Sequence, residues 1–208
     1  NDAPALKQAN IGIAMGITGT DVSKEAADMV LTDDNFASIT AAVEEGRRIF
    51  DNLVKFITWT LPTNGGEGLV ILAAIMAGVA LPILPVQILW INMTTAVLLG
   101  LMLAFEPGEK DVMNYPPRKP DSPILSGILI GRVLLVSFLL LAAVFTIFNW
   151  QKSMGYPVDV ARTVAVNLFV MSELTYLFNC RSLTRSMFKI GVFSNPWVLV
   201  GSGLMIVL

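Results

Sequence analysis

Long apolar runs separated by short polar connections dominate the chain after about residue 50. A helix needs about 20 mostly apolar residues to cross the hydrocarbon layer of a membrane. By that measure the pattern predicts about five membrane-spanning helices, the last of them truncated, near Leu53–Val79, Val86–Phe105, Ile124–Trp150, Thr163–Cys180 and from Trp197 to the end. Hydrophobic residues make up 54% of the chain and charged residues 14%, against about 25% charged residues in soluble domains. The predicted fold is therefore mainly α, a polytopic bundle in a membrane.

The first 40 residues have a different pattern. Two short apolar runs, Ile11–Met15 and Met29–Leu31, are typical of buried strands, and Thr20 is placed to cap a short helix between them. This alternation predicts the end of an α/β layer, which is too small to be stable alone. We therefore expect a soluble piece at residues 1–40, a membrane domain at 41–208, and a longer parent polypeptide.

A helical signal begins near Phe36 and continues without a break into the first predicted span. It predicts one rigid helix that connects the soluble piece to the membrane domain. Arg47, Arg48 and Lys55 precede that span, and Lys or Arg residues recur after the second and fourth spans, whereas the connection after the first span has no charge. The positive-inside rule then places the N-terminal piece in the cytoplasm. The proline-rich segment 106–120 is expected to dock against the soluble piece or the long helix.

Composition excludes several kinds of chemistry. The net charge is −2, and no basic patch is present, so nucleic acid is not expected as a partner. Cys180 is the single cysteine and histidine is absent, which excludes an internal disulfide, a thiolate metal cluster and histidine-based catalysis. Any polar chemistry in the membrane must use oxygen atoms.

Polar residues interrupt the apolar spans at three places. Asn64 and Glu67 are three residues apart in the first span, as are Asn92 and Thr95 in the second, and Glu173 lies in the fourth. Spacings of three place side chains on one helix face. A carboxylate at the centre of a bilayer costs about 2.5–3.5 kcal/mol on insertion scales, so both glutamates need a counter-charge or a proton.

A bound cation is the simplest partner for these carboxylates, since Arg132 is the one basic residue inside a neighbouring span. Carboxylate, amide and hydroxyl oxygens suit a hard ion such as Ca²⁺. Each amide or hydroxyl taken alone is more often an ordinary contact between helices, worth about 0.6 kcal/mol. Pro62 with Gly65 and Gly66 either loosens the helix beside Asn64 and frees carbonyl ligands, or provides close-packing positions.

The first residues carry a specific resemblance. Asn1-Asp2-Ala3-Pro4-Ala5-Leu6-Lys7 resembles the end of the Thr-Gly-Asp-Gly-x-Asn-Asp-x-x-Ala-Leu motif of P-type cation ATPases, and the stretches 11–16 and 18–28 match the residues after that motif in the same family. The resemblance covers essentially the whole chain. It implies a C-terminal fragment: the end of the HAD-like phosphorylation domain and the fifth through ninth membrane helices.

The same resemblance, to pumps of the calcium type, implies residue roles. It makes Asn64, Glu67, Asn92, Thr95 and Glu173 ion ligands. Asn1 would contact the phosphoryl group and Asp2 would lie in the Mg²⁺ region. Animal calcium pumps have an aspartate where this chain has Ala96, so we expect one Ca²⁺ per cycle or another cation such as Mn²⁺ or Na⁺.

The resemblance also implies that ATP and Mg²⁺ are bound mainly by missing domains, so the fragment alone should neither hydrolyse ATP nor pump. Expected partners are membrane lipid and the N-terminal part of the same pump, in a cell membrane of the bacterial type. Two other interpretations stay open. One is a non-catalytic fragment or pseudo-pump that binds partners or lipid, and the other is a passive channel.

Overall fold

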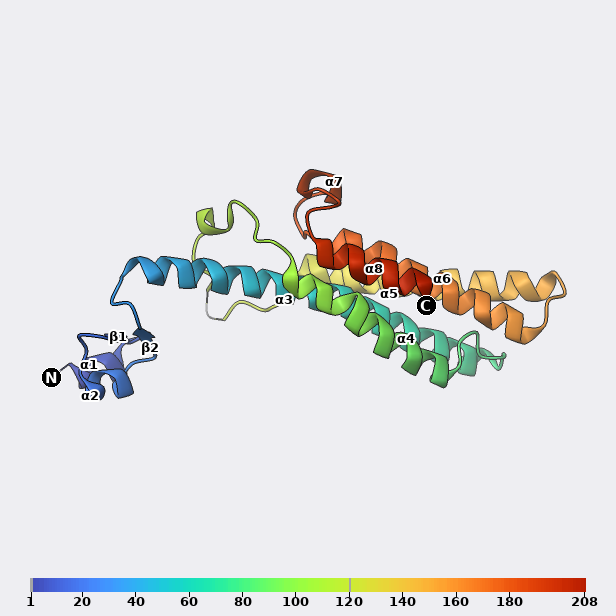
Figure 1. Ribbon diagram of the computed structural model, residues 1–208. Coiled ribbons are helices and arrows are strands. Elements are labelled where there is room, and N and C mark those ends of the chain that lie inside the picture. The colour runs from blue at the N-terminus through green and yellow to red at the C-terminus, as the bar shows by residue number, and fades with distance from the viewer. Residues whose placement is uncertain (1, 120) are drawn as a thin grey trace. The chain divides into compact units, whose positions relative to one another are not determined.

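The computed structural model describes residues 2–119 and 121–208 (Figure 1). The chain divides into two compact units. One contains the chain up to Arg48 together with Gly108–Tyr115, and the other contains Ile49–Pro107 together with Pro116–Leu208. The assignment of residues 1–40 to a phosphorylation domain stays a prediction.

The first unit contains the predicted α/β piece. After α1 (Ala3–Gln8), strand β1 (Ile13–Met15) pairs in parallel with β2 (Met29–Leu31), and α2 (Asp21–Ala26) connects the two strands. The Thr20 hydroxyl accepts a hydrogen bond of 3.3 Å from the N–H of Ser23, so Thr20 is the predicted N-cap. Both predicted strands and the helix between them are confirmed.

The predicted connecting helix is α3 (Ala37–Ala77), which is 41 residues long and contributes to both units. Within the first unit, Arg47 donates hydrogen bonds from Nη1 to the carbonyls of Val112 (2.9 Å) and Tyr115 (2.8 Å). The loop that contains the short helix η2 (Val112–Asn114) is thereby held on α3. The expected docking of this proline-rich segment against the long helix is confirmed.

The second unit is a bundle of long helices, with α5 and α6 running side by side (Figure 1). Besides the end of α3 it contains α4 (Pro85–Leu98), η1 (Gly100–Phe105), α5 (Gly127–Ser153), α6 (Val158–Cys180), α7 (Met187–Ile190) and α8 (Pro196–Val207). The stretch Pro85–Phe105 and helices α5 and α6 are long and apolar enough to cross a membrane, and α8 is a shorter apolar helix. Predicted spans two to four are confirmed in outline.

The first and fifth predicted spans differ from the other three. Helix α3 passes through the first of them, but it does not reach the apolarity of the other spans, because Asn64 and Glu67 lie within it. Helix α8 is an apolar helix of 12 residues that extends to Val207, next to the last residue of the sequence. The polar residues within α3 therefore distinguish the first predicted span from a simple hydrophobic one.

The interface between α3 and α5 decides between the two interpretations of the glycine pair. A Cβ atom added to Gly66 would lie 3.0 Å from Leu140 Cβ, and one added to Gly65 would lie 2.7 Å from Ser137 Oγ. Ser137 also donates a hydrogen bond of 3.1 Å to the carbonyl of Pro62. Helix α3 is continuous through this region, so the backbone beside Asn64 is not unwound to supply carbonyl ligands. The glycines are close-packing positions.

Candidate cation site

Glu67 and Asn92 form the first part of the site. Asn92 donates a hydrogen bond of 2.7 Å from Nδ2 to Glu67 Oε2, which joins α3 to α4. The Glu67 side chain is buried, with 3% of its surface exposed. Among the described residues, its other oxygen, Oε1, has no hydrogen-bond partner. One carboxylate oxygen is therefore left to bind something else.

Glu173 on α6 forms the second part, with 1% of its surface exposed. Its carboxylate lies near the hydroxyls of Thr95 and Thr63 and within electrostatic range of the Glu67 carboxylate. Its oxygen Oε2 has no hydrogen-bond partner within residues 2–119 and 121–208. Three helices thus bring two carboxylates, an amide and two hydroxyls together.

Thr63 is a site residue that we did not predict. It is buried on α3 and lies four residues before Glu67, a spacing that places both side chains on one helix face. In the sequence, this spacing was the only indication that Thr63 belongs to the site. Threonine hydroxyls within helices commonly bond their own backbone, as Thr63 Oγ1 also does to the carbonyl of Thr60 at 2.9 Å, and the signal is correspondingly weak.

Two further contacts fix α6 against α3 around the site. Trp59 donates a hydrogen bond of 3.1 Å from Nε1 to the backbone carbonyl of Glu173. Tyr176 donates one of 3.2 Å from its hydroxyl to the carbonyl of Thr58. Trp59 is itself buried. Trp59 thus holds Glu173 through its backbone carbonyl, and Tyr176, three residues later on α6, holds the same helix to α3.

Other polar residues do not join this cluster. The Asn64 side chain is exposed, and so is Ala96. Thr94 bonds the carbonyls of Trp90 (2.8 Å) and Ile91 (3.0 Å) on its own helix. Arg132 donates a hydrogen bond of 3.1 Å to the carbonyl of Asn179. The structure thus brings four of the five predicted ligands together, and the fifth, Asn64, is exposed on α3.

The two predicted cytoplasmic residues lie far from these groups in the sequence. Asn1 lies outside the described residues. Asp2 is exposed at the N-cap position of α1. Their predicted contact with a phosphoryl group and with Mg²⁺ stays a prediction.

The chemistry of the cluster suits a hard cation. The described residues contain no group of three or more His, Cys, Asp or Glu side chains placed to hold a metal ion. With two carboxylates, the remaining ligands would be amide and hydroxyl oxygens, which Ca²⁺ accepts among its six to eight ligands. Two buried carboxylates close together repel each other unless a cation or protons lie between them.

A bundle of apolar helices that encloses such a cluster defines an integral membrane protein. The chain belongs to the family of cation-transporting ATPases: residues 80–208 match the family described as "Cation transporting ATPase, C-terminus". The resemblance to P-type cation ATPases is confirmed.

Curated relatives cover nearly the whole chain. It is 67% identical over 201 residues to the "Probable cation-transporting ATPase F" of Mycobacterium tuberculosis, which covers 97% of this chain and 22% of the relative. It is 42% identical over 204 residues to the "Calcium-transporting ATPase" of Bacillus subtilis (96% and 22%), and 44% identical over 203 residues to the "Calcium-transporting ATPase 1" of Schizosaccharomyces pombe (98% and 23%). The chain therefore spans between a fifth and a quarter of the length of these relatives.

Proposed function

We propose that this chain is part of an ATP-driven pump that moves Ca²⁺ across a membrane through an aspartyl-phosphate intermediate. The observation that carries the proposal is the pairing of Glu67 and Glu173. Both side chains are buried, and each has a carboxylate oxygen without a hydrogen-bond partner among the described residues. Two buried carboxylates are costly in a membrane, and a bound cation would offset that cost.

The proposed site contains Glu67, Asn92, Thr95 and Glu173, with the Thr63 hydroxyl as a further ligand. Asn64 is exposed, and we propose that it contributes from the edge of the site. ATP and Mg²⁺ would be bound mainly by parts of the pump outside residues 1–208, with Asn1 and Asp2 near the phosphoryl group. The long helix α3 would then transmit changes at the cytoplasmic site to Glu67.

The distribution of Lys and Arg supports one orientation in the membrane. We propose that the N-terminal unit is cytoplasmic and that the protein lies in a cell membrane of the bacterial type, in contact with lipid. Arg47, Arg48, Lys119, Arg185 and Lys189 would then lie on the cytoplasmic side, as the positive-inside rule favours.

The test uses the full-length pump with single substitutions Glu67→Gln and Glu173→Gln. Each removes one charge and keeps the shape, and charged hydrogen-bond or ion contacts are worth about 1.5–3 kcal/mol. We expect the Ca²⁺ concentration for half-maximal ATPase activity to rise by about 10- to 100-fold. Glu25→Gln, an exposed position in α2, is the matched control. An unchanged Ca²⁺ dependence in both site variants would reject the site.

A second candidate is a pump for another cation, such as Mn²⁺ or Na⁺. The presence of alanine at position 96 and the broader name of the mycobacterial relative favour it. ATPase activity of the full-length protein measured with Ca²⁺, Mn²⁺, Na⁺ and K⁺ separates these candidates. If an aspartate at this position completes a second site, Ala96→Asp should raise the number of ions moved per ATP, whereas Val97→Asp on the neighbouring exposed position should not.

A further inference from the structure

The segment between α6 and α8, residues 182–194, combines basic residues with exposed aromatic side chains. Phe188 is 76% exposed and Phe193 is 81% exposed. Arg185 and Lys189 are also exposed, and the segment contains no Asp or Glu. Phenylalanine, tryptophan and leucine are the apolar residues with which interfacial segments enter the boundary between headgroups and acyl chains, and cations close to the membrane surface attract acidic lipids. The composition of this segment therefore fits a lipid surface.

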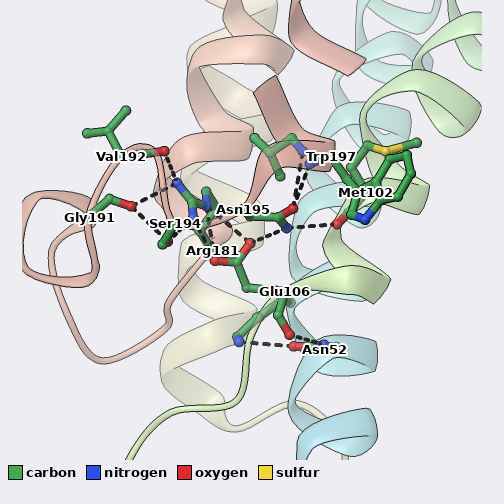
Figure 2. A network of polar contacts seen from close by, with 11 residues as sticks. Asn52, Met102, Glu106, Arg181, Gly191, Val192, Ser194, Asn195 and Trp197 are labelled. Carbon is green, nitrogen blue, oxygen red and sulfur yellow. Dashed lines mark hydrogen bonds and ion pairs between the residues drawn. The ribbon is translucent and has the colours of Figure 1, made fainter. Parts of the chain in front are cut away.

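A buried ion pair fixes this segment to the bundle. Arg181, at the end of α6, is 1% exposed and donates a hydrogen bond of 2.8 Å from Nη2 to Glu106 Oε1. The same guanidinium donates from Nη1 to the carbonyls of Gly191 (3.3 Å) and Val192 (2.6 Å) (Figure 2). The backbone just before Phe193 is thereby held in place.

The start of α8 is tied to the same carboxylate. Asn195 is fully buried and donates a hydrogen bond of 2.8 Å from Nδ2 to Glu106 Oε2. Its Oδ1 accepts from the N–H groups of Trp197 (3.0 Å) and Val198 (3.4 Å), which caps α8 (Figure 2). Because Arg181 and Asn195 share Glu106, the two ends of the segment are fixed and residues 185–193 project from the bundle.

Aromatic residues at the same end of the bundle indicate the level of the membrane surface. Trp197 is 54% exposed, and its ring centroid lies 5.9 Å from that of Phe105 at the end of η1. Exposed tryptophan at the end of an apolar helix is typical of the membrane interface. Helix α6 ends at Cys180, and Phe193 lies four residues before Trp197. The segment 182–194 therefore lies at the level of the membrane surface that Trp197 indicates.

We propose that residues 185–193 form an interfacial anchor, in which Phe188 and Phe193 insert among lipid headgroups and Lys189, with Arg185, binds the headgroups of acidic phospholipids. The anchor depends on membrane insertion of α6 and α8. It does not depend on which ion the pump carries or on whether Glu67 and Glu173 bind it. The alternative is that a cytoplasmic segment of the same pump, or another protein, covers Phe188 and Phe193.

The first experiment places an environment-sensitive fluorophore at Phe193→Cys in the full-length protein, with Cys180 and other cysteines replaced by serine. The protein is reconstituted in bilayers of phosphatidylcholine mixed with phosphatidylglycerol. We expect blue-shifted emission that nitroxide lipids labelled at the headgroup quench more strongly than lipids labelled at the chain end. Emission typical of water, with quenching by iodide, would overturn the anchor. Blue-shifted emission that no lipid quencher reduces would indicate a protein cover and would also overturn it.

The second experiment measures lipid selectivity as the ratio of quenching by spin-labelled phosphatidylglycerol to quenching by spin-labelled phosphatidylcholine. A basic residue near an acidic surface contributes about 1 kcal/mol, so Lys189→Gln should lower this enrichment by about fivefold. Lys189→Arg should retain it. Lys152→Gln, at the other end of the α5–α6 hairpin, is the matched control and should leave it unchanged. Equal ratios for Lys189→Gln and the unsubstituted protein would overturn the headgroup contact.

Discussion

The hydroxyl of Tyr176 donates a hydrogen bond of 3.2 Å to the carbonyl oxygen of Thr58. Thr58 lies four residues before Pro62, and proline has no N–H with which to complete the helical hydrogen bond to that carbonyl. Helix α6 thus supplies the hydrogen bond that the sequence of α3 omits. Since Tyr176 lies one turn after Glu173, the same contact holds the carboxylate of α6 close to α3.

Replacing Tyr176 by phenylalanine should lower the free energy of unfolding by about 1–3 kcal/mol, because the buried Thr58 carbonyl loses its partner. Pro62→Ala restores an N–H to α3, so the cost of Tyr176→Phe should shrink in that background. Denaturant unfolding of the purified protein in detergent measures both values. Tyr156→Phe, at a half-exposed tyrosine, is the control. An equal cost of Tyr176→Phe with and without Pro62 would contradict the pairing.

The close contact of Gly66 with Leu140 makes a second prediction. Gly66→Ala inserts a methyl group 3.0 Å from Leu140 atoms, and overpacking of this kind costs about 1–3 kcal/mol of stability. Gly68→Ala, two residues further along α3, meets no atom within 4 Å and should stabilise the helix by up to about 1 kcal/mol. Opposite shifts of the thermal unfolding midpoint are expected. Shifts of the same sign would reject close packing at Gly66.

Periodicity and hydrophobic runs were sufficient to predict most of the architecture. The short strands, the helix capped by Thr20 and the long helix α3 follow local rules of capping and apolar patterning. Such rules did not determine the role of Gly65 and Gly66, because these glycines together with Pro62 permit either a loosened helix or close packing. Ser137 and Leu140 of α5 decide the matter, and they lie about 75 residues away along the chain.

The candidate site could also be predicted only in part, because it too depends on contacts between helices that are distant in the sequence. Carboxylates inside apolar spans identify Glu67 and Glu173 without knowledge of tertiary contacts. Sequence spacing alone does not determine the rotation of one helix against another, so Asn64 was expected beside Glu67 but is exposed, and Thr63 was missed. The buried pair of Glu106 and Arg181 lies outside the predicted spans, where charged residues are ordinary.

The hydrogen bond from Asn92 to Glu67 leads to a third prediction, which tests the proposed pump function in the full-length protein. Asn92→Ala removes an amide that orients the carboxylate, and hydrogen bonds to charged groups are worth about 1.5–3 kcal/mol. The ion concentration for half-maximal ATPase activity should rise by about 10- to 100-fold. Thr94→Ala, which loses bonds only to its own helix, should change it little. Comparable losses at both positions would indicate a general disturbance of α4.

The buried pair of Glu106 and Arg181 makes the fourth prediction. Removing one partner of a buried ion pair leaves an uncompensated charge and costs about 3–5 kcal/mol. Arg181→Met and Glu106→Gln should each lower the unfolding midpoint strongly. The double variant should lose less than the sum of the two, because neither charge then remains alone.

Comparison with an exposed ion pair separates this effect from the general loss of a charge. Arg48 and Glu45 form a half-exposed pair, and exposed pairs contribute about 0–1 kcal/mol, so Glu45→Gln should change stability little.

Limited proteolysis gives a second measurement of the effect of the Glu106–Arg181 pair. Arg181→Met also removes the hydrogen bonds to the carbonyls of Gly191 and Val192, so cleavage after Lys189 should become faster than in the Glu45→Gln variant. Additive losses in the double variant, or unchanged cleavage, would show that this ion pair does not hold the segment to the bundle.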